Sequence, residues 1–285
     1  MGQYNFDQIL DRTHTKSLKY DFAVKRGKPA DVLPFWVADM DFEIPPELKQ
    51  ILLDRVNHGV FGYTESDDEY FDVLQNWFST RFNWIPEQKW LVKTPGIVFA
   101  LAMAVRAFTK EGEGVLINQP VYYPFSMVID DNNRHLINVP LIKGEERYTI
   151  DFEGIERAIV EENVTLFLLC NPHNPVGRVW TEDELKRLGD ICIKHNVLIV
   201  SDEIHADFVW KGHTHKVFAA LGESYAEHCI VCTAPSKTFN IAGLQVSNIF
   251  IPNDSLRRRF IKEIDRAGYS QLNTMGMWAV KGPTK

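Results

Sequence analysis

The chain is poor in cysteine and has neither a long apolar run nor an excess of basic charge. Its 285 residues include only four cysteines, Cys170, Cys192, Cys229 and Cys232, too few for a disulfide scaffold of this size. No eighteen apolar residues follow one another, so we expect no membrane-spanning helix and no membrane partner. The first residues contain no basic segment followed by an apolar run, which predicts a cytoplasmic protein.

The charge balance argues against another class of function. The formal net charge is −7, and the one notable basic cluster is Arg257–Arg259. We interpret this short cluster as the solvated face of a helix and expect no nucleic-acid partner.

Two patterns resemble pairs of metal ligands. Cys229 and Cys232 have the spacing of such a pair, but they lie in the apolar stretch CIVCTA, which predicts a strand. Residues three apart in a strand point to opposite faces, so we expect buried thiols and no metal site. His213 and His215 follow Gly212 without a nearby third ligand, and we expect both to be surface-loop residues.

Helical and strand patterns alternate through the middle of the chain, whose hydrophobic content of 45% allows a large core. Apolar runs with polar carboxyl ends predict buried strands at 115–118, 135–141, 165–170, 197–203, 229–234 and 247–252. Amphipathic or capped segments predict helices at 45–59, 97–112, 151–163, 181–196 and 254–268. This alternation predicts an α/β fold with a three-layer, doubly wound, mostly parallel sheet.

The first 44 residues follow neither pattern. Their last part, FWVADMDFEIPP from Phe35 to Pro46, is irregular and ends in prolines. We therefore expect residues 1–44 to form an arm that packs on another domain or subunit, and residues 45–285 to form the large domain.

Ligands bind at the carboxyl ends of the strands in such a sheet, and conspicuous polar segments follow those ends here. A carbonyl cofactor such as pyridoxal 5'-phosphate (PLP) needs an amine, a carboxylate beside its ring nitrogen, a donor to its phenolic oxygen and a phosphate cradle. Lys237 is the candidate amine, because a crowded lysine loses hydration and becomes nucleophilic. Asp202 is the candidate carboxylate. Taken alone, Lys237 is as well explained as a surface lysine, and Asp202 is as well explained as a helix cap.

The other requirements have candidates at neighbouring strand ends. Asn174 in NPHNPVG is a candidate donor to the phenolic oxygen, although a plain turn explains that loop as well. Gly96, Ile97 and Val98 open a helix whose free amides favour a phosphate, and ordinary capping is the alternative. Tyr122 in QPVYYPF is a candidate to lie flat on a cofactor ring, with core packing as the competing interpretation.

In their order along the chain, Gly96, Tyr122, Asn174, Asp202 and Lys237 resemble the motif series of the fold-type I PLP enzymes, the class I and II aminotransferase superfamily. The resemblance runs from about residue 35 over nearly the whole chain. It implies PLP as cofactor, Lys237 as the catalytic residue that binds the cofactor aldehyde, a PLP-binding large domain at 45–285, and a contribution of 1–44 to a small domain.

Finer details resemble one branch, the MalY/PatB-type cystathionine β-lyases, through FWVADMDF, SDEIHAD and APSKTFNIAGLQ. Where many superfamily members have a tyrosine three residues after the Asp, this chain has His205, which we count among the cofactor-binding residues. Gln245 stands where an arginine often binds the phosphate. Ala234 replaces the common serine, so Thr233 or Ser236 is expected to supply that hydroxyl.

The resemblance implies β-elimination from a sulfur-containing amino acid, such as cystathionine or a cysteine conjugate, to give pyruvate, ammonia and a thiol. Transamination by a PLP-dependent aminotransferase is the alternative, and His205 together with FWVADMDF favours the lyase. Tyr63 in FGYT is implied to reach the phosphate of a neighbouring subunit, which makes the expected assembly a homodimer.

The end of the sequence leaves a third alternative. The family's C-terminal segment, with the arginine that binds the substrate carboxylate, has no evident counterpart in the tail Gly276–Lys285. A truncated, catalytically defective remnant with an incomplete small domain, able to bind at most cofactor or a partner, therefore stays open beside the two enzymes.

Overall fold

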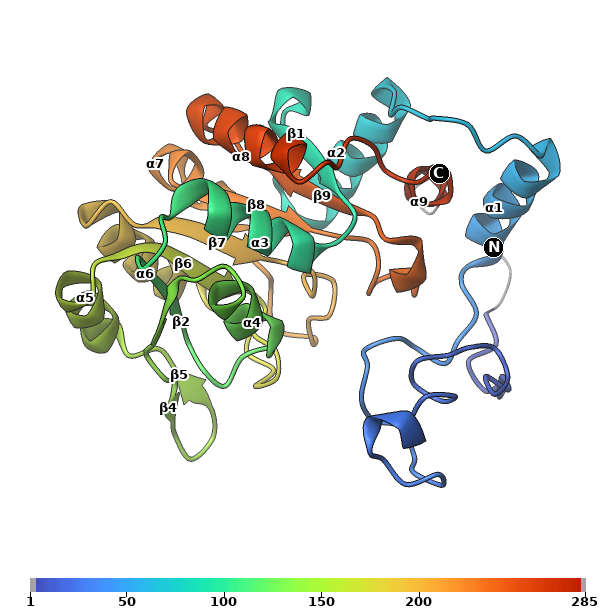
Figure 1. Cartoon of the computed structure of the whole chain (residues 1–285), viewed down its shortest axis with the longest axis horizontal. Coiled ribbons are helices and arrows are strands. Elements are labelled where there is room, and N and C mark those ends of the chain that lie inside the picture. The colour runs from blue at the N-terminus through green and yellow to red at the C-terminus, as the bar shows by residue number, and fades with distance from the viewer. Residues whose placement is uncertain (1–3, 283–285) are drawn as a thin grey trace.

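The computed structural model describes residues 4–282, so the first three residues of the expected arm and the last three of the tail lie outside it. The described chain contains a seven-stranded sheet in the order β1-β9-β8-β7-β6-β2-β3 and a two-stranded ribbon (Figure 1). The sheet strands are β1 (Leu91–Thr94), β2 (Gly114–Ile117), β3 (His135–Asn138), β6 (Val164–Cys170), β7 (Leu198–Asp202), β8 (Cys229–Thr233) and β9 (Ser247–Phe250). The ribbon pairs β4 (Ile142–Lys143) with β5 (Tyr148–Thr149).

The sheet is parallel from β3 to β8 and antiparallel at the other side, where β9 pairs with β8 and β1 pairs with β9. Every residue of β2, β8 and β9 is buried, as expected for strands covered on both faces. The mostly parallel doubly wound sheet and the six predicted strands are confirmed. The sequence analysis missed β1, a four-residue strand in which apolar and polar residues are mixed.

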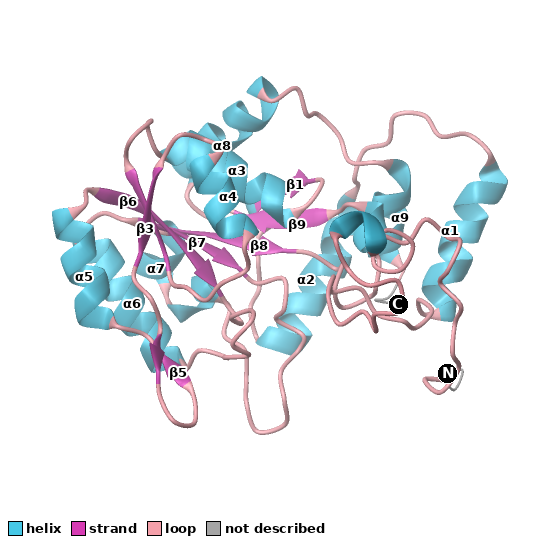
Figure 2. Ribbon diagram, turned by 60° about the horizontal axis from the view of Figure 1, so that its bottom comes forward, coloured by secondary structure: helices cyan, strands magenta, loops and turns pink. Residues whose placement is uncertain are grey.

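Helices cover both faces of the sheet (Figure 2). One face carries α3 (Ile97–Phe108), α4 (Pro124–Asp130) and α8 (Asp254–Arg266). The other carries α2 (Asp68–Phe82), α5 (Phe152–Glu161), α6 (Glu182–Lys194) and α7 (Glu223–Glu227). A capping box between Thr181 and Glu184 begins α6, where each side chain accepts a hydrogen bond from the backbone N–H of the other residue.

Two helices and the irregular start of the chain lie to one side of the sheet. Helix α1 (Pro46–His58) packs against α9 (Thr274–Lys281), which also contacts α2. Residues 4–44, blue in Figure 1, contain a single short 3-10 helix, Val24–Arg26, and otherwise form turns and irregular chain. Within residues 4–282 no helix is both long enough and apolar enough to cross a bilayer.

The cysteines and histidines give one confirmation and one correction. All four cysteines are buried, and Cys229 and Cys232 lie in the cores on opposite faces of the sheet, as the strand pattern predicted. His213 is exposed, but the prediction for His215 is wrong, because only 2% of its surface is exposed. A buried carboxylate, Glu203, binds its ring and stabilises it in the interior.

Candidate active site

The candidate site lies where the central parallel strands end. Asp202 is the last residue of β7, and its neighbours across the sheet are Cys170 at the end of β6 and Cys232 in β8. Residues paired in this way point to the same face, here the face covered by α3. The three side chains therefore form a row at the carboxyl ends of the strands, where doubly wound folds bind ligands.

Asp202 is a buried carboxyl with little compensation. It is 5% exposed, and its Oδ1 accepts a hydrogen bond of 3.1 Å from the N–H of Ile204. Burial raises the pKa of Asp202 to about 7, and the charge of Glu203 adds to this rise, while the N–H of Ile204 and the ammonium of Lys237 act against it. In the described part of the chain no cation hydrogen-bonds to this carboxyl, so it can accept a positively charged partner.

Lys237 lies in the loop after β8, close enough to Asp202 for their charges to interact. Its Nζ donates a hydrogen bond of 3.2 Å to the carbonyl of Ala38 in the N-terminal arm. Burial lowers the pKa of Lys237, and the charges of Asp39 and Asp202 offset part of that effect. The amine is therefore more often neutral, and more nucleophilic, than a lysine in water.

Side-chain contacts hold the loop that carries Lys237. Thr238 Oγ1 donates to Asp207 Oδ2 over 2.7 Å, and Arg81 Nε of α2 donates to Asp207 Oδ1 over 2.9 Å. Asn240 binds the arm through both ends of its amide: Oδ1 accepts from Met40 N, and Nδ2 donates to the carbonyls of residues 40 and 42. The arm is thereby fastened to the loop at residues 40–42, next to the carbonyl that Lys237 contacts.

The arm owes its local shape to an ionic cluster that the sequence analysis missed. Arg12 contacts Asp39 at 2.9 Å and Asp41 at 2.6 Å, and Lys19 donates to the Asp39 carbonyl over 3.0 Å. The sequence shows the acidic pair of the ADMD segment, Asp39 and Asp41. Its basic partners lie at least 20 residues earlier, too far for a helix or strand repeat to reveal the contact.

Three more predicted residues surround this group. Burial and the nearby charge of Lys237 lower the pKa of His205. Burial raises the pKa of Tyr122, and Tyr123 and Asp202 add to the rise, which places Tyr122 within electrostatic reach of Asp202. The N–H of Asn174 donates to Cys170 Sγ over 3.4 Å, so the Asn174 loop is fastened to the row that contains Asp202.

The start of α3 is open. Gly96 precedes the helix in an extended conformation, and no side chain of the described residues caps the first amides, which belong to Ile97 and Val98. A Cβ built on Gly96 would meet no atom within 4 Å. Uncapped amides at a helix start favour an anion such as a phosphate.

Two predicted residues lie apart from this group. Thr233 follows Cys232, so its side chain points to the opposite face of the sheet from Asp202, and its hydroxyl donates to the carbonyl of Asn248 over 2.8 Å. Ser236, in the loop before Lys237, is then the better candidate for a phosphate-binding hydroxyl. Tyr63 is 99% exposed, in a segment that lines a hollow of about 630 Å³ together with Gln245.

These residues fit PLP in three respects. Asp202 is a buried carboxyl without a bound cation, as a protonated ring nitrogen requires. Lys237 is an amine whose pKa burial has lowered, and its charge interacts with that carboxyl. The uncapped helix start at Gly96 has open space beside it.

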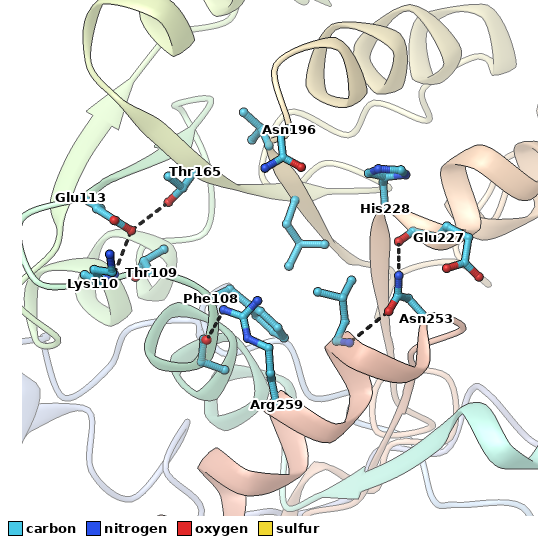
Figure 3. A pocket seen from close by; sticks show the side chains of 14 residues that line it. Phe108, Thr109, Lys110, Glu113, Thr165, Asn196, Glu227, His228, Asn253 and Arg259 are labelled. Atoms are coloured by element: carbon cyan, nitrogen blue, oxygen red, sulfur yellow. Dashed lines mark hydrogen bonds between the residues drawn. The ribbon is translucent and has the colours of Figure 1, made fainter.

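A second hollow, of about 470 Å³, lies at the opposite ends of the strands (Figure 3). Its polar groups bind one another: Glu113 accepts hydrogen bonds from Thr165 Oγ1 and from the N–H of Lys110, and Asn253 Nδ2 donates to the carbonyl of Glu227. No residue predicted for the site lines this hollow. This hollow is therefore separate from the candidate site at the carboxyl ends.

Comparisons with known proteins agree with this geometry. A family model described as aminotransferase class I and II matches residues 30–282. Cystathionine β-lyase PatB of Bacillus subtilis is 43% identical over 277 residues, which are 97% of this chain and 72% of that protein. The crystal structure of cystalysin from Treponema denticola, which contains PLP, superposes with a TM-score of 0.94 at 41% identity and covers 98% of this chain and 72% of its own. The PLP-bound C-S lyase from Staphylococcus hominis has a TM-score of 0.91 at 35% identity, covering 98% and 70%.

Proposed function

Because the chain belongs to the class I and II aminotransferase family, we propose that it is a PLP-dependent β-lyase that cleaves the carbon–sulfur bond of cystathionine or of cysteine conjugates. The observation that carries the proposal is the placement of Lys237 and Asp202, a partly buried amine and a buried carboxyl whose charges interact, at or after the ends of neighbouring parallel strands of a chain 43% identical to a cystathionine β-lyase. The residues of the site follow from this proposal.

Each part of the cofactor is assigned to groups of the site. Lys237 binds the aldehyde, and Asp202 binds the protonated ring nitrogen. Asn174 donates to the phenolic oxygen, Tyr122 lies against the ring, and His205 completes that side of the pocket. The phosphate is held by the amides of residues 96–98 and by Ser236, with Tyr63 of a second subunit as a further donor. Gln245 cannot supply the charge of an arginine, so backbone amides carry more of this binding.

The chain's own groups move the protons. Bound PLP supplies an electron sink for the α-carbon of the attached amino acid. Lys237 Nζ, when it is free and neutral, would take the α-proton of the amino acid, a role that its lowered pKa favours. Asp202 keeps the ring nitrogen protonated throughout. The thiolate leaves from the β-carbon, and the ammonium formed at Nζ carries the proton that this sulfur needs.

The working state is proposed as a cytoplasmic homodimer, with residues 1–44 as the arm and part of a small domain and residues 45–285 as the PLP-binding large domain. Four buried free cysteines support a reducing compartment. The exposed ring of Tyr63 supports a site completed by a second subunit.

The test supplies the PLP-loaded chain with cystathionine in the absence of any keto acid and follows pyruvate and free thiol over many turnovers. Lys237→Ala is the control that lacks the amine. Sustained release of both products supports the lyase. If activity required a keto acid and new amino acid formed in proportion, the protein would be an aminotransferase. If PLP bound without release of either product, the chain would be a cofactor-binding remnant.

A further inference from the structure

Directly after Asp202 the chain carries a second buried carboxylate that the proposed chemistry does not use. Glu203 is 2% exposed and points to the face of the sheet opposite to Asp202, toward a cavity lined by α2. Its partner His215 comes from the loop that follows β7 and is equally buried. The two side chains thus lie behind the strand end that presents Asp202 to the site.

Three donors hold this carboxylate. Glu203 Oε1 accepts hydrogen bonds of 2.9 Å from Ser201 Oγ and from the N–H of Phe218. Glu203 Oε2 lies 2.8 Å from His215 Nε2. Hydrogen bonds from several donors stabilise the charged form of a buried carboxyl.

The other nitrogen of His215 decides where the ring proton lies. Nδ1 is buried and has no hydrogen-bond partner among the described residues. A proton on Nδ1 would therefore be an unpaired buried donor, which is costly, so Nε2 is the nitrogen that donates to Glu203 Oε2. The Glu203 carboxylate thus accepts hydrogen bonds from three donors.

We infer that Glu203 and His215 are positioning residues for Asp202: the negative charge of Glu203, kept in place by His215, makes Asp202 hold the proton of the cofactor's ring nitrogen more tightly. The inference rests on the proposed function, because it concerns the group that Asp202 binds. The charge of Glu203 already acts on Asp202 in the cofactor-free chain, in the direction that the inference needs.

Among residues 4–282, Glu203 is the one anionic side chain whose charge raises the pKa of Asp202. Glu203 lies on the same face of the sheet as the thiol of Cys229, and burial raises the pKa of that thiol, so it stays neutral. Asp207, on the same side, is paired with Arg81.

On the other face, Asp202 acts on Cys170, Cys232 and Tyr122, whose pKa values burial likewise raises. Lys237 is the one cation of the described residues that acts on Asp202. Glu203 acts on Asp202 from the opposite face of the sheet, where no cofactor would lie between the two carboxyl groups.

The experiment compares the affinity of the full chain for PLP and for its 1-deaza analogue, which carries carbon in place of the ring nitrogen. The ratio of the two dissociation constants reports the bond between Asp202 and the ring nitrogen, and Asp202→Asn should remove the preference for PLP. Glu203→Gln should reduce the preference about tenfold, as expected for the loss of one charge inside a protein. Glu263→Gln, which removes a buried carboxylate bound to Arg106 in the α3–α8 layer, should leave it unchanged.

Two variants of His215 test the same point without touching Glu203. His215→Leu removes one of the three donors that hold the Glu203 carboxylate in place and should reduce the preference. His215→Gln can donate from its amide and should retain most of the preference. Thermal unfolding of each cofactor-free variant shows which ones are folded.

A full preference for PLP in Glu203→Gln or His215→Leu, alongside its loss in Asp202→Asn, would overturn the inference. An equal loss of affinity for PLP and for the analogue would overturn it too, because that is the signature of a purely structural role. If the unmodified chain bound PLP no better than the analogue, the assignment of Asp202 itself would fail, and the inference with it.

Discussion

Replacing Asp202 by Asn should stabilise the cofactor-free chain at neutral and alkaline pH. The carboxyl is buried, with a pKa of about 7 in place of 3.8, because burial penalises its charged form. Between these two pH values the folded chain binds more protons than the unfolded chain, so its stability falls as the pH rises and levels off above about 7. Below pH 3.8 the carboxyl is protonated in both states and contributes no such penalty.

The size of the change in stability follows from the shift in the pKa of Asp202. One pKa unit corresponds to about 1.4 kcal/mol, so the raised pKa of Asp202 lowers the free energy of unfolding by about 4 kcal/mol at pH 8 and by about 1.5 kcal/mol at pH 5. Asn has nearly the same shape, its Oδ1 can still accept the N–H of Ile204, and it does not ionise. The gain in stability should therefore be about 2.5 kcal/mol larger at pH 8 than at pH 5.

The assay is urea unfolding of the cofactor-free chain at both pH values, for the unmodified protein, for Asp202→Asn and for Glu263→Gln. Glu263 is buried too, but its carboxylate lies 2.6 Å from Arg106, so its removal should destabilise the chain at both pH values. The PLP-loaded Asp202→Asn protein should at the same time lose most of its turnover, because the neutral amide cannot hold the ring proton. An equal gain at pH 5 and pH 8, or a loss of stability at pH 8, would refute the reasoning.

Two further predictions concern the loop after β8. Lys237→Ala should lose the covalent attachment of cofactor on borohydride reduction, as followed by mass spectrometry; attachment at the usual stoichiometry would show that another residue binds the aldehyde. Asn240→Ala removes three hydrogen bonds to residues 40 and 42, so trypsin should cleave residues 4–44 several times faster than in the control Asn132→Ala, whose side chain follows α4 and donates to the carbonyl of Val128 in that helix. Equal cleavage rates would show that the arm does not depend on this contact.

The sequence predicted those parts of the fold whose structure is set by residues close to one another along the chain. The buried strands appear as continuous apolar runs, and the start of α6 appears as a capping box, because in both cases the pattern and the structure lie in the same few residues. The candidate site could be located for a related reason. In a doubly wound sheet the ends of parallel strands meet, so Asp202 and Lys237 could be placed together without knowledge of any contact.

What the sequence by itself determined is therefore the layered fold, and it predicted that the candidate site residues lie at the carboxyl ends of the parallel strands. Only the tertiary structure decided the burial of His215, the hydrogen bond of Thr233 to the Asn248 carbonyl, and the contact between the arm and Lys237. Each of these depends on groups that are distant in sequence or on another strand, such as the carbonyl of Ala38, 199 residues before Lys237. The periods of helices and strands report only which face a residue occupies, so the partner that stabilises a buried polar group becomes known only when the chain has folded.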